Sequence, residues 1–247
     1  VEPVPDVASA LTRLAEKYGM EGKRVNLIAG RDVRMMSFAI PKAGKNAMKR
    51  MAVNEMSLLD PDFGNHAAAL DLRAKTGRTM ADVTAYYMEQ RSLDAYKKAL
   101  EDGKMICGRV LVLPDCMALM ARELWREERV LLLDVSQGGM GFYVLSGGHC
   151  LACRMTGLKA GCFLREEALD MLCEEMAEQV EGLIQDCRTE ADIPVPDCMV
   201  IMTSCIPDAG AAAEYMSERF KIPCCVRMPE PVDATCLAVC VAGSLEG

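Results

Sequence analysis

The stretch R-V-L-L-L-D-V-S-Q-G-G-M-G-F-Y-V-L, residues 129–145, decides the fold that we predict for this chain. In its first part, 129–135, the residues after Arg129 form an apolar run broken only by Asp134, which is typical of a strand buried on both faces. The glycines that follow predict a turn, and 142–145 predicts a second strand. Backbone amides of a glycine turn can bind phosphate, and a carboxylate at a strand end can hold magnesium. The same pattern also occurs in ordinary hairpin turns, so this stretch alone leaves both interpretations open.

The segments on either side of this stretch alternate between strand and helix patterns. Gly147 and Gly148 predict a hairpin turn, and a long amphipathic helix with an acidic outer face is predicted at 165–187. Further strands are predicted at 24–29, 33–40, 66–73, 80–90, 107–113, 150–155, 198–203 and 224–227, and further helices at 6–18, 46–59, 92–100, 114–126, 211–220 and 234–245. Interleaved strands and helices place the chain in the α/β class. We divide it into a first region, 1–129, and a second region, 130–247, because the character of the pattern changes there.

The composition excludes several classes of protein. Hydrophobic residues make up 51% of the 247 residues and charged residues 26%, which is ordinary for a globular chain and unlike a disordered one. No apolar run approaches the ~18 residues that a membrane-spanning helix needs. A net charge of −8 and only 5% aromatic residues argue against nucleic acid as a partner, because such binding needs a basic surface or stacking side chains.

Thirteen cysteines raise the question of disulfide bonds or a metal site. The number is odd and most of them lie inside apolar runs, so we interpret them as reduced core residues of a cytoplasmic protein. The motif H-C-L-A-C at 149–153 is the strongest candidate for zinc, but a structural zinc site needs four ligands and the chain has just one other histidine, His66. We therefore expect no zinc. We also assign no catalytic residue, because the sequence contains no Gly-x-Ser-x-Gly motif or legible Ser/His/Asp set.

The order of these segments resembles that of the type IV pilus assembly protein PilM family, a branch of the actin-like ATPase superfamily. Three stretches carry the resemblance: the strand–helix pair at 26–59, the unit at 80–124, which includes V-T-A-Y-Y-M-E-Q-R-S-L-D-A-Y-K-K-A-L-E-D-G, and the aspartate loop L-L-L-D-V-S-Q-G-G-M-G-F-Y-V-L at 131–145. The resemblance implies an α/β, actin-like (ribonuclease H-like) ATPase fold. It would have two lobes, with a small α+β subdomain inserted in the first half.

The resemblance also implies which residues would contact ATP with magnesium. Asp134 would act on the magnesium ion, and the other contacts would be Ser136, Gln137, Gly138, Gly139, Gly157, Gly161, Gly210 and Gly243. The chain departs from the family at several points. Nothing in residues 1–50 resembles the family's first phosphate loop, Ser136 stands in place of a glycine, and Met140 stands in place of a threonine. We therefore expect weak binding of ATP or none, and we favour a protein that is not an enzyme.

For function, the resemblance implies a cytoplasmic scaffold, peripheral to the inner membrane, of a type IV pilus or a related secretion or competence machine. Its partner would be the short cytoplasmic tail of a single-pass inner-membrane protein, with assembly ATPases as further partners. The tail would lie as an extended peptide in an apolar groove or on a strand edge of the first region, near methionines such as Met36 and Met51. One alternative is an ATP-binding phosphotransferase or ATPase of the same superfamily, which would need complete phosphate and adenosine loops. Another is a cysteine-rich metal or redox module.

Overall fold

The computed structural model describes residues 7–30, 32–73, 79–125, 129–136, 139–157, 168–190, 193, 195–203 and 205–227. The chain divides into two compact units, Val1–Val112 and Leu113–Gly247. We expected the boundary at residue 129. It lies earlier because helix α4 (Leu113–Trp125) packs against two strands of the second unit, β7 (Gly139–Ser146) and β8 (His149–Thr156). This helix therefore belongs to the second unit.

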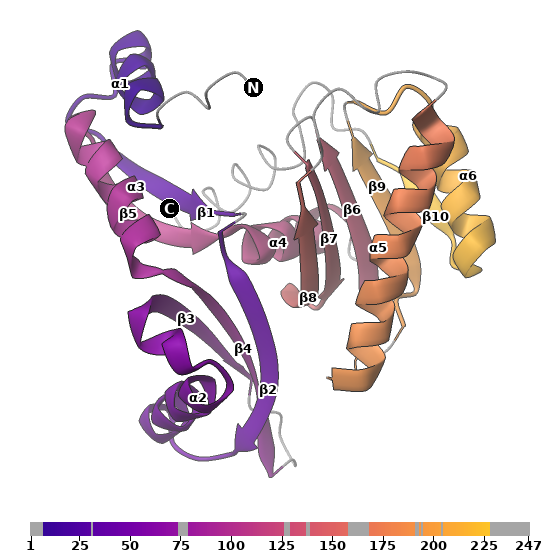
Figure 1. Ribbon diagram of the computed structural model, residues 1–247, viewed down its shortest axis with the longest axis horizontal. Helices are drawn as coiled ribbons and strands as arrows, with labels where there is room; N and C mark the ends of the chain where they lie inside the picture. Colours follow the sequence, from indigo (N-terminus) through magenta and orange to yellow (C-terminus); the bar gives the residue numbers. More distant parts are fainter. Residues whose placement is uncertain are drawn as a thin grey trace. The chain divides into compact units, whose positions relative to one another are not determined.

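The first unit contains two small sheets. One is a parallel pair of β1 (Arg24–Ala29) and β5 (Ile106–Val112). The other has three antiparallel strands in the order β2-β4-β3, with the bounds β2 (Arg34–Pro41), β3 (His66–Arg73) and β4 (Met80–Glu89). The helical segments are α1 (Val7–Tyr18), α2 (Lys45–Leu59), the 3-10 helix η1 (Pro61–Asn65) and α3 (Gln90–Asp102). Because the antiparallel sheet and α2 lie between β1 and β5 in chain order, the predicted α+β insertion in the first half is confirmed (Figure 1).

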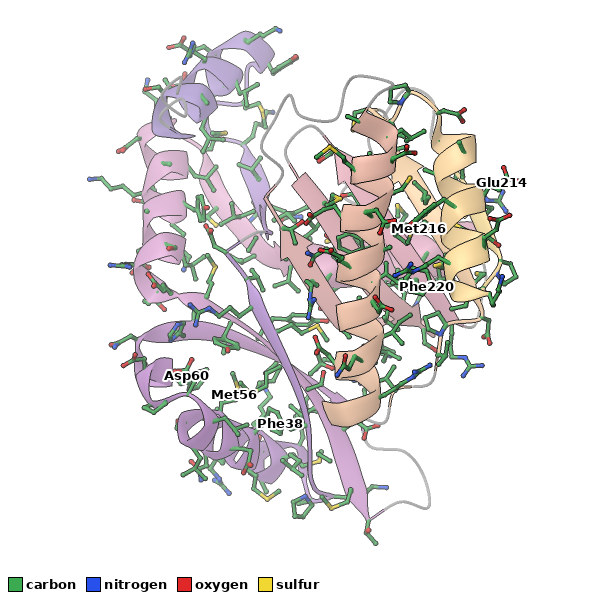
Figure 2. All side chains as sticks on the ribbon, turned by 45° about the vertical axis from the view of Figure 1, so that its right-hand side comes forward. Phe38, Met56, Asp60, Glu214, Met216 and Phe220 are labelled. Carbon is green, nitrogen blue, oxygen red and sulfur yellow. The ribbon has the colours of Figure 1, made fainter. Side chains whose placement is uncertain are left out.

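Helix α2 packs on the antiparallel sheet through residues spaced four apart. The buried residues of this helix are Met48, Ala52 and Met56. Met56 packs with Phe38 of β2, and Figure 2 shows both side chains between the helix and the sheet. The methionines that we expected near a peptide groove, such as Met36 and Met51, pack against the same clusters. Both are half-buried and contribute to core packing, and a peptide groove beside them stays a prediction.

The second unit is a larger sheet with helices on both faces. Its remaining elements are β6 (Arg129–Ser136), α5 (Leu169–Glu190), β9 (Cys198–Thr203), α6 (Ala209–Phe220) and β10 (Cys224–Val226). The strand order is β10-β9-β6-β7-β8, and β6 runs parallel to β9 and antiparallel to β7. Figure 1 shows α5 and α6 on one face of this sheet and α4 on the other.

A large hydrophobic core lies between this sheet and the layer of α5 and α6. It joins Leu133, Phe142 and Ile201 of the strands to Leu172 of α5 and Met216 of α6. On the two helices these apolar residues recur at the helical period, whereas β6 and β7 are buried along almost their whole length. Figure 2 shows Met216 and the exposed Glu214 on opposite sides of α6.

The predicted strands and helices agree with the structure to within a few residues wherever the structure describes them. Gly141 is an exception, because it was predicted in a turn and lies inside β7, opposite Asp134. A Cβ at Gly141 would lie 2.5 Å from the hydroxyl oxygen of Tyr143, so the packing of this ring requires glycine. The helix predicted at 234–245 and the beginning of the helix predicted at 165–187 lie outside the described residues.

Candidate functional site

Most of the described residues that the resemblance assigns to a nucleotide lie along one edge of the five-stranded sheet. Asp134 and Ser136 lie at the carboxyl end of β6, and Gly139 begins β7 directly opposite Ser136. Because β9 runs parallel to β6, its last residue, Thr203, pairs with Val135 at the same edge. Ligands of open α/β sheets bind at the carboxyl ends of parallel strands. These residues therefore lie at an edge where a ligand could bind, and their contact with a nucleotide stays a prediction.

Two further elements extend this edge. Thr156 of β8 pairs with Met140, so Gly157 follows at the edge. Gly210 lies in the first turn of α6, after the loop that leaves β9. The other predicted contacts lie outside the described residues; they are Gln137, Gly138, Gly161 and Gly243.

A hydrogen bond joins the two described residues that flank the turn between β6 and β7. The hydroxyl of Ser136 donates to the carbonyl oxygen of Gly139 at 3.2 Å. Gly139 has a φ of +149°, a backbone conformation that favours glycine. Met140 is 3% exposed and belongs to the hydrophobic core. In the family that the chain resembles, this position is a threonine, and Met140 therefore offers no hydroxyl to a phosphate.

Asp134 is a buried carboxylate, with 7% of its surface exposed. Its neighbours across the sheet are Gly141 on β7 and Met202 on β9. In the residues that the structure describes, no three His, Cys, Asp or Glu side chains come together as a protein-only metal site requires. A magnesium ion beside Asp134 would therefore need most of its oxygen ligands from phosphate and water.

The loop between β9 and α6 is also held by its own hydrogen bonds. The hydroxyl oxygen of Thr203 accepts from the backbone N–H of Cys205 at 3.1 Å and from that of Ile206 at 3.2 Å. The thiol of Cys205 donates to the carbonyl oxygen of Val135 at 3.4 Å, which connects the loop to β6. The N–H groups of Cys205 and Ile206 are thus occupied by an acceptor within the loop.

Asp208 caps the amino-terminal end of α6. Its carboxylate accepts from the backbone N–H of Ala211 at 2.9 Å, and a Cβ at Gly210 would lie 3.3 Å from the same carboxylate oxygen. A phosphate at this helix end would have to displace Asp208, because both bind the same N–H groups. The sequence analysis assigned Gly210 to the site and missed the roles of Thr203 and Asp208, although an aspartate just before a helix is a recognisable capping signal.

The first unit contains a polar pocket that the sequence analysis did not predict. Its volume is about 740 Å³. The residues around it come from the start of β2, from the segment around η1, and from the junction of β4 and α3. They are Arg34, Asp60, Asp62, Gly64, Asn65, His66, Glu89, Gln90, Arg91 and Asp94. Figure 2 labels one of them, Asp60, beside the end of α2.

The charged side chains of this pocket are partly paired with one another. Arg91 donates to the carboxylate of Glu89, and this hydrogen bond holds the pKa of Glu89 below its usual value. Gln90 Nε2 donates to Asp94 Oδ1 at 2.8 Å. Four carboxylates and two guanidinium groups line the pocket, so its net charge is negative with histidine neutral. The pocket therefore suits a cationic group better than a phosphate.

The cysteines of the H-C-L-A-C motif lie in β8 and do not act as a pair. Cys150 is fully buried and its thiol donates to the carbonyl oxygen of Ala152 at 3.3 Å, whereas Cys153 lies opposite Tyr143 of β7. Elsewhere, burial raises the pKa of Cys173 to about 11 and that of Cys224 to about 12, so both thiols are protonated at neutral pH. The absence of zinc stays a prediction.

Comparison of the sequence with protein-family models gave no match, and no curated protein matched it. The structure, however, matches solved structures over most of its length. A PilM–PilN type IV pilus biogenesis complex matches with a TM-score of 0.73 and 13% identity, over 90% of this chain and 74% of that chain. The cytoplasmic domain of EpsL, an inner membrane component of the type II secretion system of Vibrio cholerae, matches with a TM-score of 0.53 and 12% identity, over 96% of this chain and 80% of that chain.

MreB5 of Spiroplasma citri bound to ADP also matches, with a TM-score of 0.52 and 11% identity, over 98% of this chain and 75% of that chain. Within the described ranges, no helix is both long enough and apolar enough to cross a membrane. At sequence identities this low, the structural matches establish the fold but not the activity. The chain has the actin-like ATPase fold, as the order of its segments predicted, and its structural neighbours include proteins of pilus and secretion assemblies.

Proposed function

We propose that this chain is an actin-fold scaffold that binds the cytoplasmic tail of an inner-membrane protein and connects it to a pilus or secretion assembly. The observation that carries the proposal is that backbone donors at the edge of the second unit already have acceptors within the chain. The N–H groups of Cys205 and Ile206 donate to Thr203, and the N–H of Ala211 donates to Asp208. A protein of this fold whose loop and helix-end donors are occupied is better suited to binding a partner than to phosphoryl transfer.

The class of partner is supported by the structural neighbours. The PilM–PilN structure is itself a complex with a second protein, and the EpsL domain is the cytoplasmic part of an inner membrane component. By analogy, this chain would lie at the cytoplasmic face of the inner membrane, held there by its partner, and assembly ATPases would be further partners. No catalytic residue is needed for such a role.

The alternative function is ATP binding, with or without phosphoryl transfer. Two observations favour it. Asp134 is a buried carboxylate at the end of β6, and the hydroxyl of Thr156 at the end of β8 is buried without a hydrogen-bond partner among the described residues. If ATP binds, Asp134 would act on its magnesium ion, and Ser136, Gly139, Gly157 and Gly210 would lie near the nucleotide. The occupied donors of the loop after β9 and the capped start of α6 argue against this arrangement.

Two titrations of the whole chain test the proposal. Calorimetry with magnesium-ATP is expected to give a dissociation constant weaker than about 10 μM, which corresponds to roughly −6.8 kcal/mol. Tighter binding would favour the alternative function. In the second titration, a synthetic peptide with the sequence of the cytoplasmic tail encoded by the neighbouring membrane-protein gene is expected to bind, and a scrambled peptide is the control. A tail peptide that does not bind at about 100 μM would refute the scaffold function.

A further inference from the structure

Helix α2 is the most basic helix in the described part of a chain whose net charge is −8. It carries Lys45, Lys49 and Arg50 against a single acidic residue, Glu55. From position 33 to position 54 the sequence contains no Asp or Glu. Helix α3 of the same unit differs, because its three basic residues are matched by three acidic ones. The first half of α2 is therefore a local basic region in an acidic protein.

The basic side chains of α2 are open to solvent. One side of the helix is buried on the antiparallel sheet (Figure 1), whereas Lys45, Lys49 and Arg50 are all exposed. Among the residues that the structure describes, no carboxylate forms an ion pair with any of these three. Val53, one turn after Lys49, is 42% exposed. These four residues form a surface that we call the basic face of α2.

The order of charges along α2 does not favour the helix itself. Lys45 lies in the first turn, where the helix dipole favours acidic residues, and the last turn contains no basic residue. Gly44 at the N-cap offers no side-chain acceptor that would compensate. Helix stability therefore does not account for the basic residues, and their exposure fits a negatively charged partner outside the helix.

We propose that the basic face of α2 contacts the anionic headgroups of the membrane at which the partner holds this chain. The inference rests on the proposed function and adds a second, direct contact with the lipid surface. An anionic leaflet repels a chain of net charge −8, so close approach requires that a basic region faces the lipid.

The side chains of the basic face suit a lipid surface better than an acidic protein. Lysine and arginine near an anionic leaflet each strengthen binding by about fivefold without a fixed geometry. The exposed Val53 lies beside them and can enter the headgroup layer. Flexible cations and one apolar residue on a convex helix need no shaped partner, which is what a fluid surface offers.

Sedimentation with sucrose-loaded vesicles measures this contact for the whole chain. Vesicles of phosphatidylcholine with about 30% phosphatidylglycerol are compared with vesicles of phosphatidylcholine alone. We expect binding to the anionic vesicles at millimolar lipid, binding weaker by about tenfold or more to the neutral ones, and release when NaCl is raised from about 0.1 to about 0.5 M. Equal binding to both kinds of vesicle, or binding that salt does not release, would overturn the proposal.

Paired variants locate the contact on α2. Lys49→Gln/Arg50→Gln is expected to lower the affinity for anionic vesicles by about tenfold or more. The matched control Lys97→Gln/Lys98→Gln changes the net charge equally on α3, and a change of less than about threefold is expected, because acidic residues accompany this pair. Circular dichroism spectra and melting curves establish that each variant is folded. Equal losses in the two variants, or no loss in the first, would refute the assignment to α2.

A third variant separates charge from geometry. Lys49→Arg/Arg50→Lys keeps both charges and exchanges the two side-chain shapes, so binding like that of the unchanged chain is expected on a lipid surface. Arginine and lysine are not interchangeable where a protein partner forms specific ion pairs. A loss of about tenfold in this variant would therefore contradict a lipid contact.

The outcomes distinguish the lipid contact from the scaffold function and from a protein partner. Vesicle binding without binding of the tail peptide would refute the scaffold function and support the lipid contact by itself. Binding of the tail peptide without vesicle binding would refute only the lipid contact. Self-association that Lys49→Gln/Arg50→Gln abolishes in sedimentation velocity, in a chain that does not bind vesicles, would show that the basic face binds a second copy.

Discussion

The two units of this protein distribute their buried side chains differently. In the second unit, one continuous core joins the sheet to α5 and α6. The described residues of the first unit form four separate clusters of three to five buried side chains. The first unit also holds the polar pocket. Small clusters resist local opening less than one continuous core does, so we expect the second unit to be the rigid part and the first to carry the adaptable binding surface.

Truncation of a large core side chain in each unit tests this difference with the largest expected effect. Phe142→Ala removes a fully buried ring from the core of the second unit and is expected to lower the free energy of unfolding by about 3–5 kcal/mol. Phe63→Ala removes the same ring from a small cluster beside the polar pocket, where relaxation is easier, and about 2 kcal/mol is expected. Urea unfolding followed by circular dichroism measures both. Equal losses would contradict the comparison.

A methyl group added to a glycine in each unit should have a smaller effect. Gly141→Ala places a Cβ 2.5–2.8 Å from atoms of the buried Tyr143 side chain, so a loss of about 1–3 kcal/mol is expected from overpacking. Gly64→Ala, at the polar pocket, meets no atom within 4 Å and is expected to change stability by less than about 0.5 kcal/mol. The same unfolding measurement applies. A tolerated Gly141→Ala would mean that the β7 strand is less tightly packed than the structure indicates.

Removal of the cap of α6 tests both stability and access of a phosphate to the start of this helix. Asp208→Ala is expected to cost about 1 kcal/mol, because the N–H of Ala211 loses its acceptor. Asp208→Ser keeps an acceptor and should retain most of this stability. If Asp208 excludes phosphate from the helix end, any binding of magnesium-ATP seen by calorimetry should be tighter in Asp208→Ala than in the unchanged chain. Weaker binding in this variant would show that Asp208 belongs to a nucleotide site.

The smallest expected effect is a gain in stability. Lys221 ends α6 with a φ of +56°, a left-handed conformation that costs a side chain more than it costs glycine. Lys221→Gly is therefore expected to stabilise the second unit by about 0.5–1 kcal/mol. Lys104, after α3 in the first unit, has the same φ, and Lys104→Gly should act in the same direction. Lower melting temperatures for both variants would contradict this conformation at the helix ends.

Local patterns predicted much of the fold and part of the candidate site. The apolar run of β6 and the paired glycines 147 and 148 predicted the hairpins that the structure contains, and Asp134 and Ser136 lie at the predicted sheet edge. The pocket of the first unit could not be predicted, because Arg34, Asp62 and Glu89 belong to separate elements that only the folded sheet brings together.

Strand and helix formation followed from the sequence because periodicity, turn residues and capping residues act over a few neighbours in the chain. The contacts of the residues around the candidate site could not be predicted from such local patterns. That Met140 enters the core, that the Cys205 thiol reaches the carbonyl oxygen of Val135, and that β6 lies between β7 and β9 all depend on pairings between distant segments. Such pairings are selected by the packing of whole layers, which no single segment of the sequence encodes.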